Sequence, residues 1–374
     1  IGYQALESNT TGTQNVSVGS GALFANTTAS NNTAVGFLAL EANTSGDELV
    51  AVGRGALGAN TTANHNTAIG TSSFAANTTG TNNTGCGYNS GATNTTGGNN
   101  TAIGDFALNA NTTANNNTAV GYAALLSNTT GASNTAVGAE AMDAATTAHS
   151  SVCIGSESGG AITTGVNNTA VGHQALDATT TSSFNVAVGS GALGANTESA
   201  QTAVGHNALH NVTTGHSNVA VGTDAGDVLT TGINNVILGR SAQPSSATVS
   251  NEVVLGSSSI SALRCNTQTI SALSDARDKT NVTDLPQGLD FITKLRPVKF
   301  KWASRDGNGK DGSYEHGFIA QDLQTAQKEN DADYLNMVLN ENPDRLEASY
   351  GKLVPILTKA IQELSAKVTA LEAG

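Results

Sequence analysis

The stretch Asn134-Thr135-Ala136-Val137-Gly138 decides the fold, because near-copies of it return along most of the chain. Its glycine recurs every 17 residues from Gly2 to Gly189, then after one step of 16 at Gly205, and again every 17 residues to Gly256. Sixteen such units are the signature of a repeat protein. A unit this short cannot bury an apolar face alone, so successive units must stack into a solenoid.

Each column of the repeat has a physical meaning. The residue before the glycine is Val, Ile or Leu, with Cys86 as the exception, and the residue three before it is Thr or Val. These branched side chains suit a strand, and alternation places them on one face with a small residue, usually Ala, on the other. The apolar residue four after the glycine, as in Leu23 and Phe74, predicts a second inward contact. We therefore expect a narrow core of Val, Ala and Thr.

Turns and stacking complete the expected rung. The glycine permits backbone conformations that other residues resist, and stretches such as Asn26-Thr27-Thr28 are typical of turns, because short polar side chains bond back to the backbone. At ~4.8 Å per rung, sixteen rungs would extend roughly 75–80 Å. Because the core is thin, we expect chains to associate side by side. The prediction is a mostly β protein with an elongated parallel β-roll or β-helix shaft over residues 1–256.

The slot after the glycine varies freely, which indicates exposure. Aromatic residues in this slot could stack on sugar rings of a receptor, although scattered surface aromatics are common. The three neighbouring histidines are expected to be solvated turn residues, with no metal bound. The slot holds Tyr3, Phe37, Arg54, Tyr88, Tyr122, His173 and His206, and the histidine group is His206, His210 and His216.

Composition excludes several classes of function. The chain carries a net charge of −13 and has no basic stripe, so nucleic acid is not an expected partner. No apolar run approaches the ~20 residues that span a bilayer, so we expect no membrane insertion. Three distant cysteines offer no zinc-ligand spacing; they are Cys86, Cys153 and Cys265, and we expect Cys86 to be a small buried apolar residue. No cofactor is implied.

The repeat stops after Gly256 and ordinary globular composition begins near Ser274. We expect a Ser-rich connector over 257–273, a folded domain over 274–348, and a helix over 349–374. Four motifs mark this region: Ser274-Asp275-Ala276-Arg277-Asp278-Lys279, Leu295-Arg296-Pro297-Val298-Lys299-Phe300-Lys301-Trp302, His316-Gly317-Phe318-Ile319-Ala320-Gln321, and Tyr350-Gly351-Lys352-Leu353-Val354-Pro355-Ile356-Leu357.

Together, in this order, the motifs resemble the intramolecular chaperone of endosialidase tailspikes and phage tail fibres. The resemblance implies a module that trimerises, drives folding of the preceding fibre and then cuts itself off. It implies Ser274 as nucleophile, Lys279 as general base and the Leu273–Ser274 bond as the cleavage site. Asp275 and Arg277 are expected to form a supporting ion pair. A family histidine lies near the third motif; His316 is the nearest candidate and stays unassigned.

The expected chemistry is sound on its own terms. A serine hydroxyl needs a base, and a lysine can serve only when burial lowers its pKa. Ser-Lys dyads are a known variant of triad catalysis.

The repeats, in turn, resemble the heads of trimeric autotransporter adhesins, which form parallel β-rolls in homotrimers.

A coiled-coil seam is expected at the C-terminal end. Its apolar residues alternate steps of three and four, the spacing that lets parallel helices pair, although a helix packed on its own domain would also show an apolar face. The seam positions are Val354, Leu357, Ile361, Leu364, Val368 and Leu371.

The first functional hypothesis is a homotrimeric bacteriophage tail fibre or tailspike shaft, with a chaperone that releases itself in a single intramolecular turnover. Such a fibre would fold in the host cytoplasm, reside in the virion and bind a host receptor or glycan. The alternative is a cellular or bacterial surface fibre, adhesin-like, with the same module. A glycan-hydrolysing shaft is disfavoured, because its acidic residues are too sparse for a paired-carboxylate site.

Overall fold

The computed structural model describes residues 1–260, 263–264, 274–302, 314–339 and 346–374. The chain divides into two compact units, Ile1–Gly256 and Ser257–Gly374. Each unit contains its own hydrophobic core. Leu273 of the expected cleavage bond, Cys265 and most of the expected connector lie outside the described residues.

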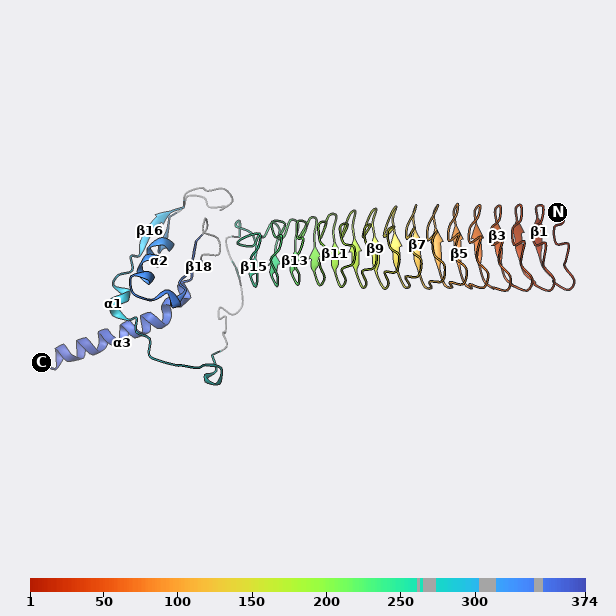
Figure 1. Cartoon of the computed structure of the whole chain (residues 1–374). Coiled ribbons are helices and arrows are strands. Elements are labelled where there is room, and N and C mark those ends of the chain that lie inside the picture. Colours follow the sequence, from red (N-terminus) through yellow and green to blue (C-terminus); the bar gives the residue numbers. More distant parts are fainter. Residues whose placement is uncertain (261–262, 265–273, 303–313, 340–345) are drawn as a thin grey trace. The chain divides into compact units, whose positions relative to one another are not determined.

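The first unit is a parallel β-solenoid, which confirms the predicted fold class. Every rung after the first contributes one three-residue strand, and the fifteen strands form one parallel sheet in sequence order (Figure 1). Neighbouring strands pair 17 residues apart, as in Val16 with Thr33, and 16 apart between Val186 and Thr202. The strands are β1 (Val16–Val18), β2 (Thr33–Val35), β3 (Val50–Val52), β4 (Thr67–Ile69), β5 (Thr84–Cys86), β6 (Thr101–Ile103), β7 (Thr118–Val120), β8 (Thr135–Val137), β9 (Val152–Ile154), β10 (Thr169–Val171), β11 (Val186–Val188), β12 (Thr202–Val204), β13 (Val219–Val221), β14 (Val236–Leu238) and β15 (Val253–Leu255).

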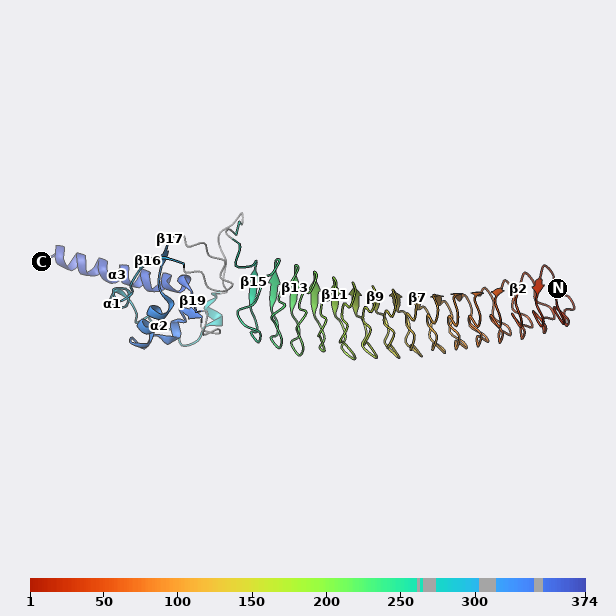
Figure 2. The ribbon, with the colours of Figure 1, turned by 90° about the horizontal axis from the view of Figure 1, so that it is seen from above.

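The core of the solenoid differs from the prediction of Val, Ala and Thr. In β2, Ala34 is fully buried, whereas Thr33 and Val35 on either side of it are partly or openly exposed. In most strands the middle residue is small and points inward, because the narrow interior leaves little room opposite the leucine of the turn. In β14 the middle residue is Ile237, which is fully buried against Gly226 of the preceding rung. That leucine, for example Leu40, is fully buried, as expected. The branched residues therefore line the outer face of the sheet, which runs along one side of the stack (Figure 2).

A ladder of buried asparagines forms a second spine inside the solenoid. The Nδ2 of Asn77 donates to Asn60 Oδ1 of the preceding rung at 3.2 Å and to the Gly80 carbonyl at 2.9 Å. The same pattern repeats from Asn26 to Asn128. Because most of these amides satisfy their neighbours, the polar groups remain buried at little cost. The column ends at Asn128, whose buried Oδ1 has no partner among the described residues. The sequence predicted turn chemistry here, and the structure adds a continuous internal hydrogen-bonded column.

Two structural constraints require glycine at the recurrent position of the repeat. Gly19 has a φ of +132°, a conformation that side chains disfavour. A Cβ at Gly19 would also lie 2.6 Å from the carbonyl carbon of Gly36 in the next rung. Close stacking of rungs therefore requires glycine as much as the turn does.

Irregular residues in the core compensate one another between rungs. Phe74 fills the buried position that leucine usually takes, and the next rung has glycine at the two positions that face the ring, Gly85 and Gly91. A Cβ on Gly85 would lie 2.7 Å from Phe74 Cδ2, and one on Gly91 would lie 2.6 Å from the Phe74 ring. The large ring is accommodated because two side chains above it are missing.

The second unit is α+β. Helix α1 (Leu289–Ile292) packs against α3 (Leu353–Glu372), and Leu289 N donates to Glu363 Oε2 at 2.8 Å. The core joins Phe291, Leu323, Met337 and Ile356 with their neighbours. The other elements are α2 (Ala320–Lys328), the antiparallel pairs β16 (Val298–Lys301) with β17 (Tyr314–Gly317) and β18 (Val338–Leu339) with β19 (Glu347–Ala348), and the 3-10 turns η1 (Ala276–Asp278), η2 (Asp333–Leu335) and η3 (Tyr350–Lys352).

The compensation around Phe74 yields a prediction. Gly85→Ala restores the residue that most rungs carry, yet it should lower stability by about 1–3 kcal/mol, because the added methyl overpacks the ring. Adding Phe74→Leu together with Ser73→Ala should recover most of that loss, since the two changes remove the ring and the hydroxyl that the added methyl would meet. Thermal unfolding followed by circular dichroism measures both effects. A stabilised Gly85→Ala single variant would contradict the packing argument.

Candidate functional site

A short capped turn organises the first motif of the second unit. Asp275 caps η1, and its Oδ1 accepts a hydrogen bond from Arg277 N at 2.9 Å. The Arg277 guanidinium also pairs with the Asp275 carboxylate at 2.6 Å. The side-chain hydrogen bond from Arg277, followed by its backbone N–H, holds the pKa of Asp275 below its usual range, and the same pair raises the pKa of Arg277. The ion pair therefore persists at neutral pH and is lost as pH falls through that lowered pKa.

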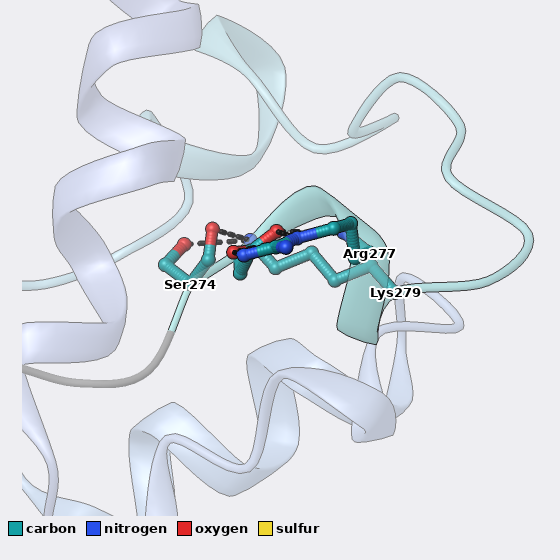
Figure 3. A network of polar contacts seen from close by, with 4 residues as sticks. Ser274, Arg277 and Lys279 are labelled. Atoms are coloured by element: carbon teal, nitrogen blue, oxygen red, sulfur yellow. Dashed lines mark hydrogen bonds and ion pairs between the residues drawn. The ribbon is translucent and has the colours of Figure 1, made fainter.

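The turn folds Lys279 back onto Ser274. Lys279 N donates to the Ala276 carbonyl at 3.3 Å, which closes the turn. The Lys279 Nζ lies 2.6 Å from Ser274 Oγ and 3.2 Å from the Ser274 carbonyl oxygen (Figure 3). Four side chains within six residues thus form one polar network, with the hydroxyl and the amine in direct contact.

This contact has the geometry of a nucleophile and its base, but the burial that a lysine base needs is missing in the single chain. A general base must lie within hydrogen-bond reach of the proton it takes, and 2.6 Å satisfies that condition. Both Ser274 and Lys279 are exposed in the single chain. A charged amine can only donate to the hydroxyl, whereas catalysis needs a neutral amine that accepts a hydrogen bond from it. Desolvation of the lysine would supply that change.

Other residues singled out in the sequence lie elsewhere. His316 is exposed in β17, where it pairs in register with Lys299, and none of the contacts of the described residues joins it to Ser274 or Lys279. The expectation that Cys86 is buried is wrong: its strand position faces outward with the branched residues, and it is exposed. Cys153 takes the inward position, and burial raises its pKa to about 12.

The described residues contain no group of three His, Cys, Asp or Glu side chains that could hold a metal ion. His206 lies 3.6 Å from Asp224, whereas the Nδ1 of His210 lies 2.8 Å from the Gly191 carbonyl. Among the described helices, none is both long enough and apolar enough to cross a membrane.

Sequence reasoning missed the contacts that join the other motifs. Arg296 of the second motif pairs with Asp322, just after the third motif, at 2.7 Å. Phe318 N donates to the Tyr350 hydroxyl at 3.2 Å, and their rings meet edge to face. The opposite charges of Arg296 and Asp322 were a usable signal for the first contact. The second depends on tertiary packing that no local pattern encodes.

Comparison with known families bears directly on this region. Residues 274–331 match a family model that is named for a peptidase and described as the chaperone of endosialidase. The match begins at Ser274 itself and lies in the C-terminal region, which is consistent with a chaperone domain there. The family implies self-cleaving serine-type peptidase activity. No curated protein and no solved structure matched the chain.

A chaperone-of-endosialidase region that follows a β-solenoid fits a tail-fibre or tailspike-like protein. The family also suggests trimeric self-association. The resemblance of the repeats to adhesin heads stays a prediction.

The capped turn yields a prediction for self-cleavage. Asp275→Asn keeps an oxygen for the Arg277 N–H but loses the ion pair, whereas Asp275→Ala loses both. Because the cap helps to hold the turn closed, Asp275→Ala should slow cleavage more than Asp275→Asn does. Timed denaturing gels after refolding measure the rates. Equal rates for the two variants would show that the cap does not position Lys279.

Proposed function

We propose that the chain is a homotrimeric bacteriophage tail fibre or tailspike shaft whose C-terminal module drives assembly and then releases itself at Leu273–Ser274. The observation that carries the proposal is the contact between Ser274 Oγ and Lys279 Nζ in a chaperone-of-endosialidase region that follows a solenoid. The fibre would fold in the host cytoplasm and reside in the virion, where its shaft would meet a host receptor or glycan.

The reaction follows from the residues at the site. Neutral Lys279 takes the proton of the Ser274 hydroxyl while Oγ attacks the Leu273 carbonyl carbon. The peptide nitrogen of Ser274 leaves as an amine, which receives that proton, and an ester joins Leu273 to Ser274 Oγ. Water then hydrolyses the ester and frees the Leu273 carboxyl group. Asp275 and Arg277 keep the turn closed, so that the amine stays on the hydroxyl.

Trimerisation would explain how Lys279 becomes able to act as a base for Ser274. Lys279 is exposed in one chain, whereas a lysine that acts as a base has to be buried. A neighbouring copy that covers the turn would desolvate the amine and favour its neutral form. Cleavage would then follow assembly, because an unassembled chain lacks an active base.

The exposed seam on α3 supports association of this unit. The helix uses Leu353, Ile356 and Ala360 to pack on its own unit. Its heptad positions face away from that contact and are between 42% and 81% exposed. They are Val354, Leu357, Ile361, Leu364, Val368 and Leu371. Because six apolar side chains in a heptad register are unpaired in the single chain, a coiled coil of copies would bury them.

The outer face of the sheet supports association of the shaft. Its two columns, three before and one before each glycine, hold no charged residue along all fifteen strands. Val18, Ile69 and Leu255 show how open these side chains are, at 39%, 43% and 53% exposure. A strip of fifteen strands at ~4.8 Å spacing and about 10 Å width covers on the order of 700 Å², close to the roughly 800 Å² per partner of a standard interface.

Repetition explains why a chaperone would be needed. Each rung presents nearly the same branched residues to a neighbouring copy, so a shift of one rung between copies loses only the end contacts. A module that first joins the three chains at one end would set the register before the rungs meet. Once the shaft is assembled, the module has no further task and can be released.

Cleavage gives the most direct test of the dyad. The wild-type chain should yield a fragment that begins at Ser274, and both Ser274→Ala and Lys279→Ala should remain whole, because one lacks the nucleophile and the other the base. Thr280→Ala is the matched control, since it removes an exposed hydroxyl beside the dyad. N-terminal sequencing identifies the cut. Processing of Ser274→Ala at the same bond would refute the mechanism.

The α3 seam gives a test of assembly. Light scattering of Ser274→Ala should return about three times 37.5 kDa. The double substitution Ile361→Glu with Leu364→Glu should reduce trimer by at least about tenfold, because it buries charge in the seam. Ala366→Glu, on the opposite side of the helix, should leave the mass unchanged. A trimer unaffected by the seam variant would show that α3 does not join the copies.

A further inference from the structure

An aromatic cluster occupies three successive rungs on the surface of the solenoid. The Tyr88 and Phe106 ring centroids lie 5.3 Å apart with planes at 88°, and Phe106 meets Tyr122 at 6.2 Å and 86°. Tyr88 and Tyr122 are 47% and 55% exposed, whereas Phe106 is half-buried. Phe106 thus holds two open tyrosine rings in fixed orientations, which a lone surface tyrosine does not have.

A carboxylate lies between the two tyrosines. Asp105 occupies the slot after the glycine in the middle rung, in the same column as Tyr88 and Tyr122. Its Oδ1 accepts a hydrogen bond from Tyr88 N at 2.8 Å, which draws the carboxylate toward the first ring. Among the described residues, this exposed carboxylate forms no salt bridge.

Backbone pairing fixes the positions of these side chains. Phe106 N donates to the Tyr88 carbonyl at 2.9 Å, and Ala123 N donates to the Asp105 carbonyl at 3.0 Å. The three slots therefore stand one rung apart along the solenoid. A ligand that lies along the axis would meet a ring, a carboxylate and a second ring in turn.

We infer that Tyr88, Asp105 and Tyr122, with Phe106 as their support, form a binding site for a neutral glycan. The C–H groups of a pyranose carry slight positive charge and pack on the electron-rich face of an aromatic ring. The Asp105 carboxylate accepts hydrogen bonds from sugar hydroxyls, and bonds to a charged acceptor are the stronger kind. The site deepens the proposed function, since it assigns a ligand class to the shaft of an external fibre.

Charge selects against acidic glycans. The chain carries a net charge of −13, and the centre of the site is itself a carboxylate. A sialic acid placed there would bring a second negative charge beside Asp105, which is destabilising. Neutral hexose chains meet the same rings without that repulsion, so the site distinguishes the two classes.

The chain provides a matched control in the same repeat slot. Phe37 is 51% exposed, as open as the two tyrosines, but the neighbouring rungs place Ser20 and Arg54 in that slot. It offers a single ring without a partner ring or carboxylate. Phe37→Ala therefore removes comparable apolar surface without touching the cluster.

The test uses the full-length, uncleaved Ser274→Ala protein on an array of neutral and sialylated oligosaccharides, followed by titration calorimetry with the strongest neutral binder. Tyr88→Ala and Tyr122→Ala should each weaken binding by about tenfold, because each removes one stacking face. Asp105→Asn should weaken it less, and Phe37→Ala should leave it unchanged. Light scattering and thermal unfolding confirm that each variant keeps its assembly and fold.

Three results would overturn the inference: no binding to any neutral glycan, equal binding of sialylated glycans, or equal losses for Phe37→Ala and Tyr88→Ala. Loss of trimer in Tyr88→Ala and Tyr122→Ala would make the cluster an interface between copies and would also overturn it. Cleavage is measured separately on chains that retain Ser274. Failure of the glycan site would therefore leave the processing mechanism standing, and the reverse also holds.

Discussion

The structure of the shaft depends on one steric constraint, the narrow interior of a 17-residue rung. In most strands a small residue fits at the middle, so Ala34 and its equivalents are buried while Thr33 and Val35 are turned outward; the large Ile237 of β14 fits because it lies against Gly226. The same constraint packs rungs so closely that Gly19 cannot carry a side chain against Gly36. Stability then has to come from the stacking of the rungs, from the hydrogen-bonded asparagine column and from burial of the outer face of the sheet.

That outward turn of the branched residues links the fold to the proposed assembly. A charge-free strip of Val, Ile and Thr along the whole sheet is poorly suited to water but well suited to a second copy. Because the strip is repetitive, it provides affinity without a unique register. The C-terminal unit adds an exposed heptad seam and the contact between Ser274 and Lys279, which are both exposed in the single chain. In the proposed function, self-release therefore follows assembly rather than preceding it.

The repeat predicted the solenoid, its period and the inward leucines, because a strict spacing leaves few alternatives for chain geometry. It did not predict which face of the strand is buried: alternation separates Ala34 from Val35, but only the volume of the closed rung decides between them. For the same reason, the sequence did not show which of the two thiols, Cys86 or Cys153, is buried. The match over residues 274–331 bears out the chaperone resemblance, whereas the proximity of Ser274 to Lys279 required the capped turn, and the cluster around Phe106 required knowledge of which slots stack.

The central claim is that copies of the chain meet through the outer face of the sheet, in register. Cys86 tests it directly, because this thiol replaces a branched residue on that face, while Cys153 is buried. In a Cys265→Ser, Ser274→Ala chain, mild oxidation or a short bismaleimide should link copies through Cys86, and a bulky maleimide should fail to label it in the folded assembly. Free labelling of Cys86 by the bulky reagent, with no cross-link, would contradict the account.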